Sequence, residues 1–327
     1  MQARKMAFTS FAIACTLGQA GTAAAQGFPS RPITMIVPFA AGGSGDTIAR
    51  IVGERLRVAL GQPVIIENVA GASGSIAGAR VARTPGDGYT LIQGNWATHV
   101  LNGAIFNLQY DLLNDFQPIS LLATESLIVV SRKTLPASDL KELIAWLRAN
   151  PDKASAGTGG GGSVGHVAGV FFQKETGTRF TFVPYRGVGP AMQDLVAGQI
   201  DLMFDTAANS LPQVRAGNVK VYAVTSASRL ADAPDIPTAG EAGLPGFLFS
   251  NWRAIWAPKG TPAPIVDRLN AAVREVLADA AVRRRLAELG QEIVPEAQQT
   301  PRALASHHKA EIEKWWPIIK AAGIKGE

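Results

Sequence analysis

The residues whose types and spacing most clearly indicate a binding or reaction site form a glycine-rich stretch, from Val37 to Asp46. This stretch directly follows an apolar run. Its glycines, Gly42, Gly43 and Gly45, allow a backbone with positive φ and a close approach to a ligand. Helical periodicity follows, so the free N–H groups of a helix N-terminus point to the same place. The stretch therefore predicts an anion site, for a cofactor phosphate, a reaction oxyanion, or a carboxylate that is bound and released unchanged.

A nucleotide cofactor is the first alternative, because Gly157, Gly159 and Gly162 fit the GxGxxG pattern between a strand and a helix. Such a site also needs an acid at the end of the next strand, roughly 20 residues on, to hold the ribose. That strand ends in Pro184–Arg186, without an acid, and the sequence contains no GxxxxGK[ST] motif. We therefore expect no cofactor.

A secreted α/β-type serine hydrolase is the second alternative, because residues 161–165 read GGSVG and fit the GxSxG nucleophile elbow, with Ser163 as the nucleophile. The elbow needs its serine on a tight turn directly after a strand, whereas residues 158–162 intervene here. His307 and His308 have the required chain order, but they fall within a predicted helix, where we expect exposure to solvent. The hydrolase stays the alternative to a binding protein.

Other polar residues follow apolar strands, at the ends where ligands bind in open α/β sheets. They are Asn95, Thr98, Thr158, Ser163, His166, Arg186 and Asp205, together with Gly187 in the turn after Arg186. Three candidate residues also have a structural interpretation. Asp46, in the glycine-rich stretch, could stabilise its own helix N-terminus; Arg186 could form a salt bridge between lobes; and His166 could bond its own loop.

The histidines and tryptophans leave further alternatives. The 4 histidines show no HxH or HExxH spacing, so we expect no metal site. His99 follows a polar loop and could line a cleft or bond the loop backbone. Trp96 and Trp252 could wall a cleft, although core packing is the commoner use of tryptophan.

The elements that must position these residues alternate between strand-like and helical patterns from Ile33 onward, which is typical of an α/β fold. Two apolar strands, 119–123 and 127–130, are expected to carry the chain to a second unit. A strand over 251–257 then returns it to the first. We therefore predict one lobe from 28–127 plus 250–327 and another from 128–249.

The composition of the 327-residue chain indicates a globular protein, and its N-terminal segment indicates export. Arg4 and Lys5 precede an apolar segment that ends in small residues near Ala25, which predicts a cleaved signal peptide over residues 1–25. The only cysteine, Cys15, lies within it, so disulfides are not expected. The net charge of +5 falls to +3 without Arg4 and Lys5, and this charge is too diffuse for nucleic acid.

Taken together, these motifs resemble the receptors of tripartite tricarboxylate transporters, also called the Bug family. The matching motifs are Phe28–Ile33, Pro38–Phe39 with Gly42, Gly43 and Asp46, Thr84–Leu91, Gly157–His166, Pro184–Ala191, Gly198–Asp201 and Trp252–Pro258. Their order and spacing extend over most of the mature chain.

The resemblance implies a two-lobed α/β periplasmic binding protein of the Venus flytrap, type II-like class, in which each lobe is a Rossmann-like sheet flanked by helices. It implies a monomer without catalysis that carries a small mono-, di-, tri- or aromatic carboxylate to a membrane permease; a soluble sensor is not excluded by sequence. One ligand carboxylate would lie between residues 39–46 and 158–163. The expected ligand-binding residues are Phe39, Ala41, Gly42, Gly43, Asp46, Asn95, Thr98, Thr158, Gly159, Ser163, His166, Arg186, Gly187 and Asp205.

Overall fold

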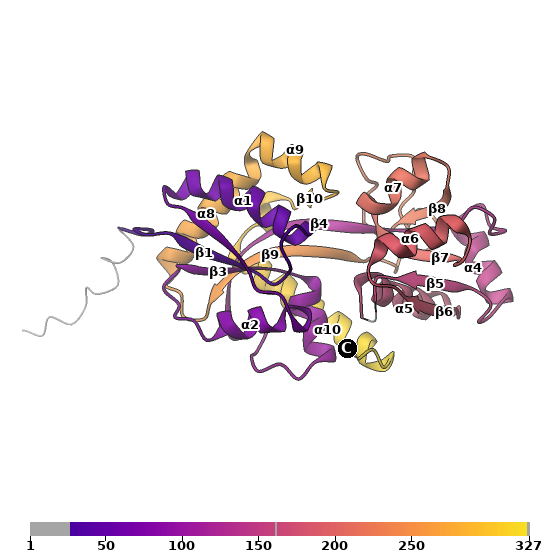
Figure 1. Cartoon of the computed structure of the whole chain (residues 1–327), viewed down its shortest axis with the longest axis horizontal. Coiled ribbons are helices and arrows are strands. Elements are labelled where there is room, and N and C mark those ends of the chain that lie inside the picture. Colours follow the sequence, from indigo (N-terminus) through magenta and orange to yellow (C-terminus); the bar gives the residue numbers. More distant parts are fainter. Residues whose placement is uncertain (1–26, 161, 326–327) are drawn as a thin grey trace, which may run out of the picture.

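The chain forms two α/β lobes joined by long strands (Figure 1). The computed structural model describes residues 27–160 and 162–325, so the expected signal peptide lies outside the described residues. The first lobe combines the N-terminal strands with the C-terminal helices, and the second contains the middle of the chain. The predicted two-lobed α/β class is confirmed.

The sheet of the first lobe has the strand order β2-β1-β3-β9-β4, with the short β10 added to β4. Strands β1, β2 and β3 are parallel, whereas β9 runs antiparallel to both β3 and β4. Their bounds are β1 Ile33–Val37, β2 Val64–Asn68, β3 Thr90–Asn95, β4 Phe116–Arg132, β9 Ser250–Pro258 and β10 Glu292–Ile293.

Helices cover both faces of this sheet because its strands are apolar on both sides. In β1, Ile33, Met35 and Val37 pack with α1 and α8, whereas Ile36 joins the cluster that includes α2 and α10. The bounds are α1 Ser44–Leu60, α2 Ser75–Ala82, α3 Asn102–Ile105, α8 Ala263–Ala278, α9 Ala280–Glu288 and α10 Pro301–Ala321, with the short turns η1 Ala72–Gly74, η2 Ala97–Leu101 and η3 Glu296–Gln298. None of the described helices is both long and apolar enough to span a membrane.

The second lobe uses the far half of β4, which lies between β7 and β8 and pairs antiparallel with both. Strand β5 is parallel to β6 and β7. The strands are β5 Ser155–Thr158, β6 Thr181–Pro184, β7 Leu202–Thr206 and β8 Val219–Val224, and the helices are α4 Leu140–Ala149, α5 Val164–Thr176, α6 Val188–Ala197 and α7 Ala207–Arg215.

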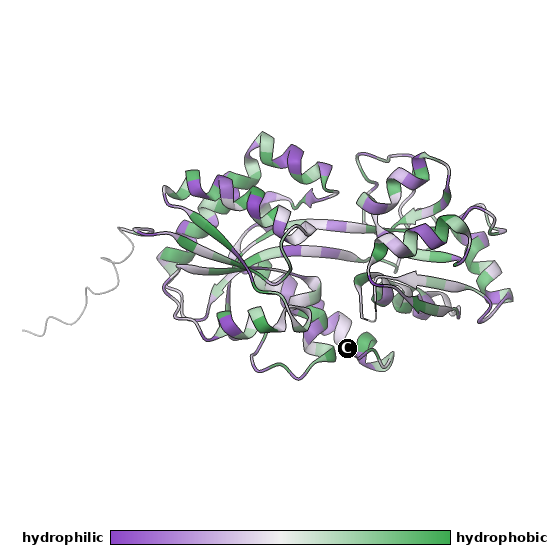
Figure 2. Ribbon diagram, in the orientation of Figure 1, coloured by the Kyte–Doolittle hydropathy of each residue, from purple (hydrophilic) through white to green (hydrophobic). Residues whose placement is uncertain are grey.

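Strand β4 corrects one expectation, because the two strands predicted at 119–123 and 127–130 are a single strand of 17 residues. The residues between them are polar but include no glycine or proline, so nothing interrupts the extended backbone. Strand β4 pairs with β9 as far as Ser126 and with β7 and β8 from Leu127 onward. Figure 2 shows hydrophilic stretches where β4 and β9 pass between the lobes.

Trp96, Trp252 and the C-terminal histidines belong to the first lobe. Trp96 and Trp252 are fully buried, so neither side chain walls a cleft. The expected exposure of His307 and His308 is wrong, because α10 packs against the sheet on the face that carries them. His308 is buried and its Nε2 donates to the carbonyl oxygen of His99 (2.6 Å), while His307 is half-buried against Trp252.

Candidate functional site

The candidate site is a cavity of about 760 Å³ whose lining comes from both lobes and from the two long strands between them. This volume lies within the usual range for small-molecule sites, roughly 300–1,000 Å³. The sequence-predicted residues that line it are Phe39, Gly43, Asn95, Gly159, Ser163, Gly187 and Asp205.

Helices α1, α5, α6 and α7 all begin at this cavity, since residues of the first turn or N-cap of each belong to its lining. The N-caps of α1, α6 and α7 are Gly43, Gly187 and Thr206, and none of them makes a side-chain cap hydrogen bond. The first N–H groups of a helix lack intrahelical acceptors and carry partial positive charge. The backbone therefore presents hydrogen-bond donors to the cavity from both lobes.

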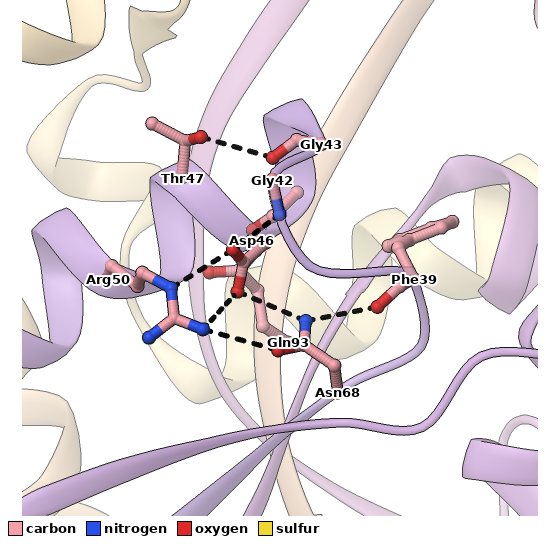
Figure 3. Close-up of polar contacts among 9 residues, drawn as sticks. Phe39, Gly42, Gly43, Asp46, Thr47, Arg50, Asn68 and Gln93 are labelled. Carbon is pink, nitrogen blue, oxygen red and sulfur yellow. Dashed lines mark hydrogen bonds and ion pairs between the residues drawn. The ribbon is translucent and has the colours of Figure 1, made fainter.

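The α1 loop is held in place from behind by Asp46, which is 3 % exposed and is not part of the cavity lining (Figure 3). Its Oδ2 accepts from the backbone N–H of Gly42 (2.8 Å) and from Nε of Arg50 (3.0 Å), and its Oδ1 accepts from Nδ2 of Asn68 (3.0 Å). The hydrogen bond from Arg50 is the main reason that the pKa of Asp46 falls to about 2. Both carboxylate oxygens are therefore engaged in fixing the loop.

Two further contacts fix the same loop at the start of α1. Asn68 also donates to the carbonyl oxygen of Phe39 (3.0 Å), and the buried Gln93 donates to that of Gly45 (3.0 Å). A Cβ on Gly45 would lie 2.8 Å from the Phe39 ring, so only glycine allows this ring to pack on the helix start. Ala41 and Gly42 are exposed and lie outside the cavity lining.

The polar turn after β3 brings only one of its predicted residues to the cavity. Asn95 lines it, and its Oδ1 accepts from the backbone N–H of Thr98 (3.0 Å). Thr98 lies buried behind this turn. His99 stacks on Trp256 with 3.8 Å between ring centroids, and burial lowers its pKa well below the ordinary value. Thr98 and His99 therefore support the turn from the core.

The loop between β5 and α5 is held by its own side chains. Thr158 Oγ1 donates to the carbonyl oxygen of Gly160 (3.3 Å), and Nδ1 of His166 accepts from the N–H of Gly162 (3.0 Å). Thr158 and His166 are not part of the cavity lining. Burial lowers the pKa of His166, which favours the neutral ring that can accept this bond.

Ser163 lines the cavity as the N-cap of α5, and its Oγ accepts from the backbone N–H of His166 (3.4 Å). It is not on a tight turn after β5, and within the described residues no histidine ring is bonded to its hydroxyl. Arg186 is exposed and forms no ion pair with any described residue. The geometry of a serine hydrolase is thus not present around Ser163.

The floor of the cavity contains charged residues that the sequence reasoning missed. Arg253, on β9, is 3 % exposed, and its Nη2 lies 3.6 Å from Oε2 of Glu125 on β4. Arg253 also donates from Nη2 to Oγ of Ser44 and from Nε to Oε1 of Gln291, both at 3.2 Å. Burial raises the pKa of Glu125, while the nearby guanidinium of Arg253 opposes that rise. A charged residue within an apolar strand was the signal that could have indicated this pair.

Asp205, at the end of β7, lines the cavity and is 1 % exposed. Its Oδ2 accepts from Nδ2 of Asn209 and from Oγ of Ser210 (2.8 Å), both on α7. Burial raises the pKa of this carboxyl, and the hydrogen bonds from Asn209, Ser210 and the backbone N–H of Thr206 oppose the rise only in part. In the part of the chain that the structure describes, no three His, Cys, Asp or Glu residues are arranged to hold a metal ion.

The fold and the cavity together define a two-lobed solute receptor with no metal cluster among its described residues. The chain belongs to the tripartite tricarboxylate transporter receptors, because the model described as "Tripartite tricarboxylate transporter family receptor" matches residues 48–324. The family expected from the motifs is thereby confirmed. Receptors of this family bind solutes and are not enzymes, and the hydrolase alternative finds no support in the comparisons.

Three solved structures illustrate this similarity. MatC from Rhodopseudomonas palustris with bound malate is 41 % identical, with a TM-score of 0.75 over 89 % of this chain and 100 % of that one. The periplasmic binding protein BugD is 37 % identical, with a TM-score of 0.74 over 92 % and 100 %. Rpa4515 from R. palustris with adipate is 36 % identical, with a TM-score of 0.76 over 91 % and 99 %.

Proposed function

We propose that this chain is a periplasmic receptor that binds a small carboxylate between its lobes and delivers it unchanged to a membrane permease. The observation that carries the proposal is the convergence of the α1, α5, α6 and α7 N-termini on one cavity. Each terminus offers N–H donors and favours a negative charge by about 0.3–1 kcal/mol. Malate in MatC and adipate in Rpa4515 support the same ligand class.

The backbone, more than the side chains, would select for an anion. The charged side chains of the lining are Glu125, Asp205, Glu288 and Arg253, so acids outnumber the base. A carboxylate would therefore bind near the rim, between the α1 loop and the starts of α5 and α6. The signal sequence at residues 1–25 would export the receptor, and residues 27–325 would act as a monomer.

Release of the ligand would follow from movement of the lobes. The lobes are connected by β4 and β9, so we propose a hinge near 127–130 and 248–252. Closure would exclude water and strengthen the hydrogen bonds to the ligand. No group bonded to Ser163 would activate it, which is consistent with a ligand that leaves intact.

A thermal-shift screen of carboxylates, sugars and amines tests the proposal. A ligand that binds only the folded state stabilises it by about 2.7 kcal/mol at 100 times its Kd. We expect at least one carboxylate to raise the melting temperature. A screen in which only sugars or amines do so would contradict the proposed function, and ester hydrolysis that is lost on Ser163→Ala would contradict the absence of catalysis.

A further inference from the structure

The polar atoms of the cavity are divided between its rim and its floor. The rim is formed by the helix starts, whose uncapped N–H groups are donors. We define the floor as four side chains of the lining: Glu125 on β4, Asn251 and Arg253 on β9, and Asp205 on β7. All four are at least nine-tenths buried, so the floor lies just beneath the cavity surface.

Three donor atoms of the floor, Nε and Nη2 of Arg253 and Nδ2 of Asn251, have acceptors among the described residues. Arg253 donates to Ser44 and Gln291, and Nδ2 of Asn251 donates to Oε2 of Glu125 (3.3 Å). One oxygen of Asp205 likewise has partners, on Asn209 and Ser210.

Two acceptors of the floor have no partner among the described residues: Oδ1 of Asp205 and Oδ1 of Asn251. Asp205 is 1 % exposed and Asn251 is 5 % exposed, so neither oxygen is compensated by bulk water. A ligand carboxylate cannot satisfy them, because an ionised carboxylate has only acceptors. The floor also holds two acids and one base, which disfavours a second negative group at this place.

We propose that the floor is a subsite for a hydrogen-bond donor of the ligand, so that the ligand is a carboxylate with a hydroxyl or amino substituent. This rests on the proposed function and narrows its ligand class. The carboxylate accepts from the helix starts at the rim, and the substituent donates to the floor when the lobes close: a hydroxyl, with its one hydrogen, to Asp205 or Asn251, and an ammonium to both. A ligand without the substituent leaves both acceptors unpaired in a site that is dry after closure.

Two matched series of acids test the subsite by titration calorimetry on the mature chain. The first is succinate, malate and aspartate, and the second is glutarate, 2-hydroxyglutarate and glutamate; within each series only the substituent changes. A buried unpaired acceptor costs enough to predict that a substituted acid binds at least about 10-fold more tightly than its parent. A hydroxyl preference and an amino preference both support the subsite.

Binding of the unsubstituted acids as tightly as the substituted ones overturns the subsite, and so does binding of none of the six. In the second case a carboxylate found in the wider screen would still support the proposed function. If no carboxylate binds at all, both proposals fail.

The variant Asp205→Asn tests the assignment to the floor. Asn209 and Ser210 are donors, so the new amide at position 205 keeps its oxygen toward them. Its NH₂ group then takes the place of Oδ1, and a donor replaces the acceptor. The ratio of affinities between substituted and unsubstituted acid should then fall toward one. Asp201→Asn is the matched control, because Asp201 bonds Arg132 and Ser155 outside the cavity lining. A ratio that falls equally in both variants contradicts the assignment; if Asp205→Asn does not fold, the six acids decide on the native chain.

Discussion

The substitution Asp46→Asn tests whether the anion loop is held by a buried carboxylate (Figure 3). Asparagine has nearly the same shape, but it loses the charge that pairs with Arg50, 2.9 Å away. It also loses one acceptor, so it cannot serve Gly42, Arg50 and Asn68 together. The loop should remain in place with fewer bonds, and the folded state should become less stable.

The size of the effect follows from the pKa of Asp46, which lies at about 2 instead of 3.8. One pKa unit corresponds to about 1.36 kcal/mol, so the full shift would be worth about 2 kcal/mol. Arg50 is 54 % exposed, and solvent screens part of its attraction. We therefore expect Asp46→Asn to lower the free energy of unfolding by about 1–2 kcal/mol at pH 7.

The pH dependence of the difference has a definite sign. The pKa of Asp46 is lower in the folded than in the unfolded state, so its ionised form stabilises the fold above pH 3.8. That contribution is lost as the pH falls from 3.8 through about 2, where the carboxyl is protonated in the unfolded state and half protonated in the folded state. The difference in the free energy of unfolding between wild type and variant should therefore shrink over this range.

Urea unfolding of wild type and variant between pH 7 and pH 2 measures this gap. Asp87→Asn is the control, because Asp87 and Arg31 are both largely exposed and such pairs contribute about 0–1 kcal/mol. The reasoning is refuted if Asp46→Asn is as stable as wild type at pH 7, or if the gap is unchanged at pH 2.

Three further substitutions test the core around the site. Arg253→Met leaves Glu125 buried without its cation and should cost about 3–5 kcal/mol in urea unfolding; an unchanged midpoint would contradict the buried pair. His308 has a pKa of about 4, below its ordinary 6.5. The free energy of unfolding of the wild type should therefore fall by up to about 3 kcal/mol as the pH falls from 6.5 to about 4. The variant His308→Gln should lose less stability over the same range. If the stability of both proteins falls equally with pH, burial of His308 does not contribute to the pH dependence. Trp252→Ala should cost about 3–5 kcal/mol by melting, whereas a loss of ligand affinity without lost stability would place the ring in the cleft.

Elements defined by local signals were predictable from the sequence. The helical periodicity expected after the glycine-rich stretch is helix α1, Ser44–Leu60, because its apolar spacing is regular and Gly61 ends it with a φ of +71°. Asp139 caps α4 by accepting from the N–H of Glu142 (2.8 Å), and an aspartate directly before a helical run is a local signal for such a cap. These features depend on a few neighbouring residues, so a single sequence is sufficient.

Features set by distant pairing were not predictable. The Glu125–Arg253 pair depends on the register of β4 against β9, and those strands are far apart in the chain. The alternative roles of Asp46 could not be separated either, because Asn68 reaches it only through the pairing of β2 with β1. His308 is buried because α10 packs against the sheet, which no pattern within the helix specified.

The most direct test of the central claim compares a carboxylate with its own amide. Titration calorimetry would use the carboxylate that most stabilises the chain in the thermal-shift screen, together with the corresponding uncharged amide of the same shape. If the helix starts select for negative charge, the carboxylate binds and its amide binds at least about 10-fold more weakly. An amide that binds as tightly as the acid would contradict the account of the cavity as a carboxylate site.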